Sequence, residues 1–361
     1  MIKKKILKLM EVTVDEKIIN CIKIINNTHK EFVYVVNKKK QLIGILTDAD
    51  VRKAILKKID LESSIKKIYN KNPKFVYEND NLQTVDEVFR KTNVNFLPVV
   101  NKSKKVVDLK RINNHNKIIN LKAIRKSNKK NTLIIMAGGK GLRLRPLTKN
   151  NPKPLIKIKD KKSILEYNID YFQSQGIEKI FIITHYLSHK INDKLKKNKS
   201  YFKKITIIRE KKQMGTIGGI GLIDKKKINL PSIVINGDII CDINLKSFYN
   251  FHEINKNDLT LALKIISSKS DFGEVSIKNL KIKNIEEKKI KTTFINAGIY
   301  CIGEKIFDII KSKKEKINMD FLIKNSLKKG CKVGGYPMLE FWMDIGNKNN
   351  LNIIRNIFKK K

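Results

Sequence analysis

The segment from Leu133 to Leu155 constrains the fold of this chain more than any other stretch. It reads LIIMAGGKGLRLRPLTKNNPKPL, in which a short apolar run passes directly into a glycine-rich, basic turn. An apolar run that ends at glycines is typical of a central parallel strand whose carboxyl end opens into a loop. The pattern therefore predicts an α/β fold with a ligand-binding loop at this strand end.

The residues of this loop indicate a phosphate site. Glycines allow backbone N–H groups to approach an anion, and the forked donors of Arg143 and Arg145 suit phosphate oxygens. Lys153, between two prolines, adds a third cation on a stiffened loop. For the glycines alone, a solvated basic turn is an equally good interpretation, because short glycine matches are common. The three glycines are Gly138, Gly139 and Gly141.

Taken together, these residues closely resemble the signature of the sugar-1-phosphate nucleotidyltransferases, GGxGxRLxPLT followed by PKP. A P-loop is excluded, because Gly139 and Lys140 are followed by Gly141 rather than by Ser or Thr. Leu142 stands where the family usually has Thr. The resemblance implies a nucleotidyltransferase domain built on a Rossmann-like, mixed and mainly parallel sheet.

Strand-like runs alternate with helical stretches after this point, which predicts a mainly parallel sheet with helices on both faces. Ligands of such sheets bind beyond the carboxyl ends of the strands, where the glycine-rich turn lies. The expected strands cover residues 133–136, 179–184, 205–208 and 232–236, and the expected helices cover residues 163–175 and 188–196.

Two aspartates follow apolar runs in the same way. Asp238 ends the run IVINGD, and Asp344 lies in FWMDIG. Either alone fits a turn-forming Asp beside Gly, but together they resemble, in order and separation, the family's two magnesium aspartate motifs. Carboxylate oxygens are preferred magnesium ligands, and Mg²⁺ neutralises a departing pyrophosphate. We therefore expect Asp238 and Asp344 to hold Mg²⁺.

Four further stretches resemble motifs of the same family. They are Glu210 with QMGTIGG at 213–219, resembling ExxPLGTAG near the base and sugar; FGEV at 272–275; EEK at 286–288, with Lys289 in place of the family's Pro; and NAGIY at 296–300. The resemblance covers residues 131–361, essentially the whole second domain.

The resemblance implies a role for each matched position. Arg143 is expected to stabilise charge on the triphosphate and the departing pyrophosphate, and Lys153 to hold phosphate near the reaction centre. A phosphate oxygen attacks the α-phosphorus in line, which needs charge neutralisation and alignment rather than a general base. The expected nucleotide-binding positions are Ala137, Gly138, Gly139, Gly141 and Gly215. The expected sugar-phosphate-binding positions are Gly273, Glu287, Lys288 and Asn296.

The N-terminal part contains an internal near-repeat of a small α/β unit. Residues 32–52 and 96–110 share a strand-turn-strand layout, and helical stretches at 15–26 and 84–92 precede them. Two such copies predict a pseudo-symmetric pair. This part resembles a tandem cystathionine-β-synthase (CBS) domain pair, a module that often binds adenine nucleotides between its halves.

Only the first copy keeps the residues with which the CBS family contacts ribose and phosphate, Thr47 and Asp50. The second copy has Asp108, Leu109 and Lys110 at the corresponding positions. The resemblance implies one adenine nucleotide site at most, with Thr47 and Asp50 as its ligands. Alternatively, Thr47 caps the following helix and Asp50 favours its first turn, and the pair serves in assembly. Both interpretations stay open, and a homo-oligomer is expected from either.

A polar, charged stretch at 122–131 separates the two parts, and we place the boundary near residue 128. The predicted domains are a CBS pair at 1–125, regulatory or for assembly, and a catalytic domain at 131–361.

The formal charge of +44 raises the question of a polyanionic partner. The excess is spread along the whole chain together with abundant Ile and Asn, which indicates a bias towards A/T-rich codons. We therefore expect no nucleic-acid partner.

The four cysteines have no metal-binding spacing, and no apolar run resembles a signal peptide or a bilayer span. No membrane insertion is expected, and a reducing, cytoplasmic location is predicted.

The expected reaction transfers a nucleoside monophosphate, GTP being favoured as donor, to a sugar 1-phosphate. The combination resembles nucleotidyltransferases of bacterial surface-glycan pathways, including guanylyltransferases that activate glucosamine 1-phosphate towards legionaminic acid. The alternatives are the same chemistry with mannose 1-phosphate or glucose 1-phosphate and another nucleotide, or a catalytically inactive nucleotide-sensing subunit. Base and sugar rest on the resemblance alone.

Overall fold

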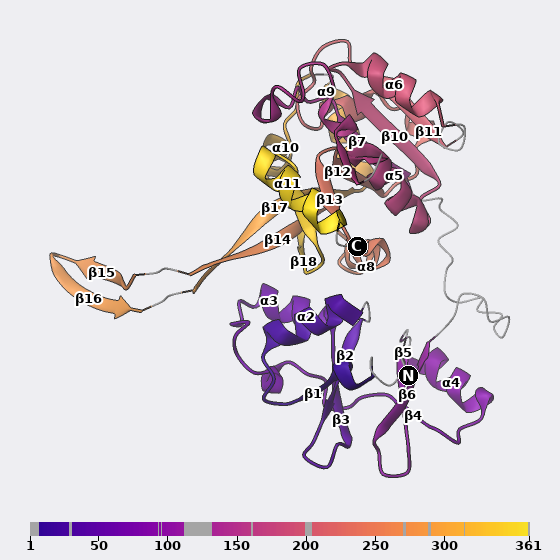
Figure 1. Ribbon diagram of the computed structural model, residues 1–361, viewed down its shortest axis with the longest axis vertical. Coiled ribbons are helices and arrows are strands. Elements are labelled where there is room, and N and C mark those ends of the chain that lie inside the picture. The colour runs from indigo at the N-terminus through magenta and orange to yellow at the C-terminus, as the bar shows by residue number, and fades with distance from the viewer. Residues whose placement is uncertain are drawn as a thin grey trace. The chain divides into compact units, whose positions relative to one another are not determined.

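A computed structural model gives the chain as two compact units, Met1–Arg125 and Lys126–Lys361, which are described separately (Figure 1). The linker predicted at 122–131 lies outside the described residues. The structure describes residues 7–28, 31–92, 94, 96–111, 132–159, 162–198, 204–269, 272–287, 290–313 and 315–359.

The first unit contains two three-stranded sheets of the same design. In each sheet the first pair of strands is parallel, and the second pair is antiparallel and corresponds to the predicted strand-turn-strand repeat. The first sheet has the order β1 (Glu11–Thr13), β2 (Phe32–Val36), β3 (Leu42–Thr47). The second has the order β4 (Val76–Tyr77), β5 (Phe96–Val100), β6 (Val106–Arg111).

The two halves of this unit share one core. Val100 of the second half packs in a buried cluster with Met10, Phe32 and Leu42 of the first. The backbone N–H of Leu42 also donates to the carbonyl of Lys104, at 2.8 Å. The described part of this unit includes the helices α2 (Ile18–Thr28), α3 (Asp48–Leu56) and α4 (Leu82–Thr92) and a short 3₁₀ turn, η1 (Ile65–Lys67).

The second unit is built around a seven-stranded sheet with the order β11-β10-β7-β12-β17-β14-β18. The first four strands run parallel, β17 is antiparallel to β12 and β14, and β18 is parallel to β14. The predicted mixed, mainly parallel sheet is therefore confirmed. Its strands are β7 (Thr132–Ala137), β10 (Lys179–Thr184), β11 (Ile205–Arg209), β12 (Ser232–Asn236), β14 (Leu259–Lys269), β17 (Ile290–Ile302) and β18 (Val333–Met338).

Apolar cores cover both faces of this sheet. Along β7, Leu133 and Ile135 belong to one buried cluster, whereas Ile134 belongs to the other, because side chains alternate along a strand. This double burial explains why β7 is a continuous apolar run. The first core contains residues of α5 (Ile164–Ser174), α6 (Ser188–Lys196) and α8 (Leu245–Ile254), and the second contains residues of η4 (Gly218–Leu222), α9 (Glu304–Lys313) and α10 (Met319–Lys328).

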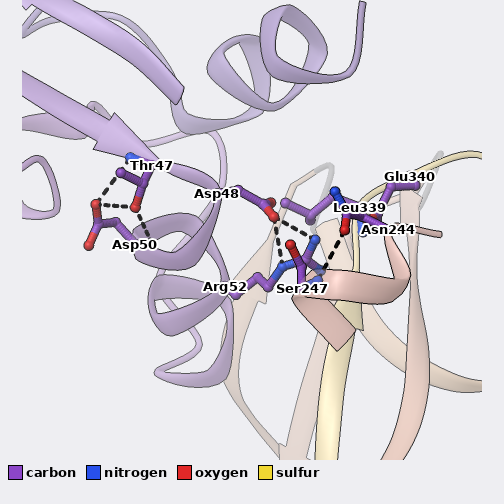
Figure 2. Close-up of polar contacts among 8 residues, drawn as sticks. All are labelled: Thr47, Asp48, Asp50, Arg52, Asn244, Ser247, Leu339 and Glu340. Carbon is purple, nitrogen blue, oxygen red and sulfur yellow. Dashed lines mark hydrogen bonds and ion pairs between the residues drawn. The ribbon is translucent and has the colours of Figure 1, made fainter. Parts of the chain in front are cut away.

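Two helix starts show how local sequence positions these layers. Ser163 and Glu166 form a capping box that begins α5, with Ser163 N–H donating to Glu166 Oε2 at 2.9 Å. Asn244 begins α8 by accepting from Ser247 N–H at 3.0 Å (Figure 2). These caps satisfy backbone donors that a helix start would otherwise leave without partners.

Smaller elements complete the second unit. A C-terminal helix, α11 (Lys348–Lys359), buries Leu351 and Ile354. No helix among the described residues is long and apolar enough to cross a membrane, and all four cysteines are buried. Three two-stranded sheets are formed by β8 (Lys157–Lys159) and β9 (Lys162–Ser163), β13 (Ile239–Cys241) and β19 (Trp342–Asp344), and β15 (Glu274–Lys278) and β16 (Lys281–Glu286). The remaining 3₁₀ turns are η2 (Leu142–Leu144), η3 (Lys153–Leu155) and η5 (Lys225–Lys227).

Candidate active site

A cavity of about 340 Å³ opens at the carboxyl ends of β7 and β12 in the second unit. Its wall combines residues at and just after the ends of these strands with Ile183 of β10 and with residues of three other segments, at 153–154, 210–216 and 316–318. This is the edge of the sheet at which ligands of parallel sheets bind. The wall contains Met136, Ala137, Gly138, Gly139, Lys153, Pro154, Ile183, Glu210, Gln213, Gly215, Thr216, Asn236, Gly237, Asp238, Lys316 and Asn318.

The glycine-rich turn is shaped by Gly141. This residue has a φ of +64°, and a Cβ here would lie 3.0 Å from Thr148 Cγ2. Thr148 Oγ1 in turn donates to the Gly141 carbonyl at 2.8 Å. Gly141 therefore fixes the turn, whereas Gly138 and Gly139 line the cavity itself.

Gly215 joins the cavity to a distant loop. Its φ is +85°, and a Cβ would lie 2.3 Å from the carbonyl oxygen of Ile317. Ile317 N–H donates to the Met214 carbonyl at 2.9 Å, and Ile217 N–H donates to the Ile317 carbonyl at 3.1 Å. Only glycine permits this close approach of two backbones.

The same loop brings Lys316 and Asn318 into the cavity wall. Asn318 Oδ1 accepts from Thr216 N–H at 3.2 Å. Sequence reasoning did not select Lys316 or Asn318, and no local motif marks either of them. Their place depends on the backbone contacts of Ile317, which lies far from Gly215 along the chain.

Lys153 lies between the two predicted metal ligands. Its Nζ donates to Asp238 Oδ2 at 2.5 Å and lies 3.9 Å from Asp344 Oδ1. Pairing of β13 with β19 holds the two carboxylates together, since Ile239 is opposite Asp344 and Ile345 N–H donates to the Asp238 carbonyl at 2.9 Å. Asp344 does not line the cavity but adjoins Asp238, which does.

Arg143 lies near the Asp344 carboxylate. A Cβ on Gly346 would lie 2.9 Å from a guanidinium nitrogen of Arg143 and 3.0 Å from Asp344 Oδ2. The two charged groups therefore flank one glycine. The structure thus brings together Arg143, Lys153, Asp238 and Asp344, which sequence analysis selected separately.

The pair of aspartates fits a hard divalent cation. Burial is the largest cause that raises the pKa of Asp344, and the negative charge of the neighbouring Asp238 raises it further. The nearby cations Lys153 and Arg143 lower this pKa by a smaller amount. Asp344 Oδ1 is buried without a hydrogen-bond partner. Two close carboxylates with a spare buried oxygen match the oxygen ligands of Mg²⁺. Among the residues that the structure covers, no group of three or more His, Cys, Asp or Glu side chains is placed to hold a metal.

Glu210 is a buried acid in the cavity wall, 3% exposed. A Cβ on Gly138 would lie 3.3 Å from its Oε2, and a Cβ on Gly219 would lie 2.3 Å from its Oε1. Desolvation by burial raises the pKa of Glu210. Its Oε1 has no hydrogen-bond partner. Glu210 lies in one of the motifs found in the sequence but is not among the predicted site residues.

Of the predicted sugar-phosphate positions, the three that the structure describes do not line this cavity. Gly273 and Glu287 lie together, because a Cβ on Gly273 would be 2.9 Å from Glu287 Oε1. They flank the β15–β16 ribbon, which Figure 1 draws beyond the ends of β14 and β17. Asn296, on β17, donates through Nδ2 to Tyr300 Oη at 2.9 Å. Lys288 lies outside the described residues.

In the first unit, Thr47 and Asp50 form a capping box at the start of α3 (Figure 2). Asp50 Oδ2 accepts from Thr47 N–H at 3.1 Å and from Thr47 Oγ1 at 2.6 Å. Thr47 Oγ1 accepts from Asp50 N–H at 3.1 Å. Asp48 and Arg52 form an ion pair one turn apart, at 2.8 Å. The cap that was predicted as one of the two interpretations is therefore present.

Comparison with known families matches both parts of the chain. The nucleotidyl transferase family matches residues 132–360, and the CBS domain matches residues 5–57 and 65–109. The predicted tandem CBS pair is thereby confirmed.

Individual relatives match the second part. Mannose-1-phosphate guanyltransferase 2 of Candida glabrata is 31% identical over 221 residues, 59% of this chain and 60% of that protein. The bifunctional protein GlmU of Methanococcus maripaludis is 32% identical over 237 residues, 63% of this chain and 54% of that protein. This chain therefore spans less than two thirds of the length of either relative. HddC from Yersinia pseudotuberculosis, solved in complex with GMP-PN, superposes with a TM-score of 0.50 at 26% identity, covering 63% of this chain and 99% of that one.

Proposed function

Because this chain belongs to the nucleotidyl transferase family, we propose that it transfers a nucleoside monophosphate from GTP to a sugar 1-phosphate and releases pyrophosphate. The observation that carries the proposal is the cluster of Lys153, Asp238 and Asp344 beside a glycine-lined cavity. We assign catalysis to residues 131–361, and a regulatory or assembly role to the CBS pair at 1–125.

In this reaction a phosphate oxygen of the sugar 1-phosphate attacks the α-phosphorus of the triphosphate. The bond from the α-phosphorus to the bridging oxygen breaks, and pyrophosphate leaves with that electron pair. Lys153 holds the phosphates at the cavity wall, and Arg143 stabilises charge on the departing pyrophosphate. Both substrates are anions, so alignment beside fixed cations lowers the barrier without proton transfer.

Asp238 and Asp344 are the proposed magnesium ligands. When bound, the cation neutralises phosphate charge and helps to orient the reacting groups. With only two carboxylates supplied by these residues, substrate oxygens and water would complete its coordination. Lys153 then belongs to the same charge cluster, since its ammonium group already contacts Asp238.

Glu210 supports guanine as the base. The Watson–Crick edge of guanine presents two adjacent N–H donor groups, at N1 and N2, whereas each of the other bases presents only one donor group, beside an acceptor. A carboxylate has acceptor oxygens only and pairs with two parallel donors. Glu210 lies beside Gly138, one of the positions assigned to the nucleotide, and its buried Oε1 has no hydrogen-bond partner. The relative from Candida glabrata carries guanyltransferase in its name.

We propose that Ala137, Gly138, Gly139, Gly141 and Gly215 contact or shape the nucleotide site. Gly273, Glu287, Lys288 and Asn296 remain the proposed contacts of the sugar phosphate. In the CBS pair, an adenine nucleotide near Thr47 and Asp50 is proposed on the family resemblance, and pure assembly is the alternative.

The test is pyrophosphate release with magnesium, using GTP, CTP, UTP, ATP and dTTP in turn against hexose and hexosamine 1-phosphates. The panel includes glucosamine 1-phosphate, mannose 1-phosphate and glucose 1-phosphate. Turnover that is highest with GTP and one sugar supports the proposal and identifies the product. Turnover with another nucleotide overturns the assignment of the base, and folded protein that is silent with every pair favours a nucleotide-sensing subunit.

A further inference from the structure

The β15–β16 ribbon is a two-stranded sheet separate from the main sheet of the second unit. In Figure 1 it projects beyond the ends of β14 and β17, away from the helices of that unit. A two-stranded ribbon is only marginally stable in water, and further strands or packing normally stabilise it. The ribbon is therefore a candidate surface for association with another chain.

One face of the ribbon is apolar and uncovered. Val275 is opposite Ile285, and Ile277 is opposite Ile282, so these four side chains share one face. Their exposed fractions are 46% for Val275, 61% for Ile285, 67% for Ile277 and 71% for Ile282. A contiguous exposed apolar face of this kind marks an interaction surface.

The two edges of the ribbon differ in their ability to accept a further strand. On β16, Lys283 is an extra residue, because Ser276 is opposite Asn284 while the next residue, Ile277, is opposite Ile282. Bulges and lysines protect an edge against strand addition. β15 has no extra residue, and within the described part of the chain its outer edge pairs with no strand. The β15 edge is the open one.

The sequence of β15 is complementary to itself. It reads EVSIK, and antiparallel pairing with a second copy about Ser276 sets Glu274 opposite Lys278, Val275 opposite Ile277, and Ser276 opposite Ser276. Opposite charges and β-branched pairs across strands are stabilising. Within one ribbon, by contrast, the end at Glu274 carries like charges, since Glu274 is opposite Glu286.

We propose that two copies of this chain associate by antiparallel pairing of their β15 strands around a two-fold axis at Ser276. The result is a four-stranded sheet with the order β16-β15-β15-β16. Its outer strands are the protected β16 edges, and its apolar side chains form one continuous face. A two-fold interface of this type uses the same surface on both copies, as self-complementarity requires.

The pairing is tested by cross-linking the full-length chain through Ser276→Cys. Cα atoms of directly opposed residues in antiparallel strands are about 4.5 to 5.5 Å apart, within the range of about 4.4 to 6.8 Å that a disulfide spans. The four native cysteines are buried, so few disulfides should form through them during oxidation. Mild oxidation should convert most of the S276C chain into a disulfide-linked dimer, seen as doubled mass on a non-reducing gel.

Asn284→Cys is the matched control, because Asn284 is opposite Ser276 on the same ribbon and face but on the protected strand. Adding Glu274→Lys to S276C should reduce the cross-link to the level of N284C, since both charge pairs become repulsive. Adding Lys278→Glu as well should restore it.

Equal cross-linking of S276C and N284C would overturn the proposed pairing, as would a yield that is unchanged by the single charge reversal. Because the readout is the covalent dimer, association through the CBS pair alone does not imitate the expected result.

Discussion

Lys153 Nζ lies 2.5 Å from Asp238 Oδ2, so a buried cation and a proposed metal ligand form one charge-assisted pair. Lys153 is only 8% exposed, so the Asp238 carboxylate replaces part of the hydration that the ammonium group loses on burial. The pair also implies that the carboxylate exchanges or shares this partner when a cation binds. Asp238 is therefore the most informative position to change.

Asp238→Asn should lower turnover by about 100-fold or more, because it removes a charge at the centre of the cluster while keeping the shape of the side chain. Pyrophosphate release at saturating magnesium and substrates measures the loss. The fold should survive, since Lys153 keeps Asp344 at 3.9 Å as a second partner. Circular dichroism checks this.

Asp193→Asn is the control for that experiment. Asp193 is exposed on α6, away from the cavity wall, and its neutralisation should leave turnover unchanged. A D238N enzyme as fast as D193N would remove Asp238 from the reaction centre.

Gly215→Ala should destabilise the second unit. The left-handed φ of +85° is costly for alanine by roughly 1 to 2 kcal/mol, and the new Cβ would collide with the Ile317 carbonyl. Thermal unfolding followed by the fluorescence of Trp342, the only tryptophan, reports on this unit. Gly330→Ala is a useful comparison, because Gly330 has a φ of +68° but a Cβ there meets nothing within 4 Å. G215A should unfold at a clearly lower temperature than G330A.

Gly139→Ala should weaken nucleotide binding without changing the stability of the fold. A Cβ on Gly139 meets nothing within 4 Å, so the unfolding temperature should not change. Because Gly139 lines the cavity, the methyl group would occupy space that we assign to the triphosphate. We expect the KM for GTP to rise while stability is retained, and an unchanged KM would mean that the phosphates bind elsewhere.

The layers of the second unit could be predicted because their signals are local. The expected strands at 179–184 and 232–236 and the helix at 188–196 have the observed bounds, since apolar runs and helical periodicity are written in consecutive residues. The helix expected at 163–175 begins one residue later because Ser163 is its N-cap.

The cavity wall was only partly predictable, for a physical reason. The turn after β7 and the aspartates carry their own motifs, but Lys316 is brought in through backbone bonds of its neighbour Ile317 to Met214 and Ile217. Such a contact depends on how α9 and α10 dock, not on local residue pattern. The register of the β15–β16 ribbon is likewise visible only once the strands are paired.

Glu210→Gln should weaken discrimination in favour of GTP. The amide keeps one acceptor but places an N–H₂ group against one of guanine's two donors, which should lower kcat/KM for GTP by about 10- to 100-fold. The same variant with UTP is the internal control, because a base with a single donor loses less. A GTP-to-UTP ratio that does not change would exclude Glu210 from base recognition.

His252 predicts how stability depends on pH. It is 4% exposed, its Nδ1 lies 2.8 Å from Thr260 Oγ1, and desolvation lowers its pKa to about 4, against a weaker opposing effect of Asp258. Since the unfolded chain binds this proton more readily, the neutral imidazole favours folding above pH 6.5. That contribution is lost as the pH falls from 6.5 towards 4, by about 2 kcal/mol between pH 7.5 and pH 5.

Urea unfolding followed by Trp342 fluorescence at these two pH values measures the loss. The His252→Gln variant cannot titrate at this position, and its other ionisable groups are the same as those of the unmodified protein. Its loss of stability between the two pH values should therefore be smaller, by about 2 kcal/mol. An equal loss in both would mean that His252 takes up its proton in the folded state.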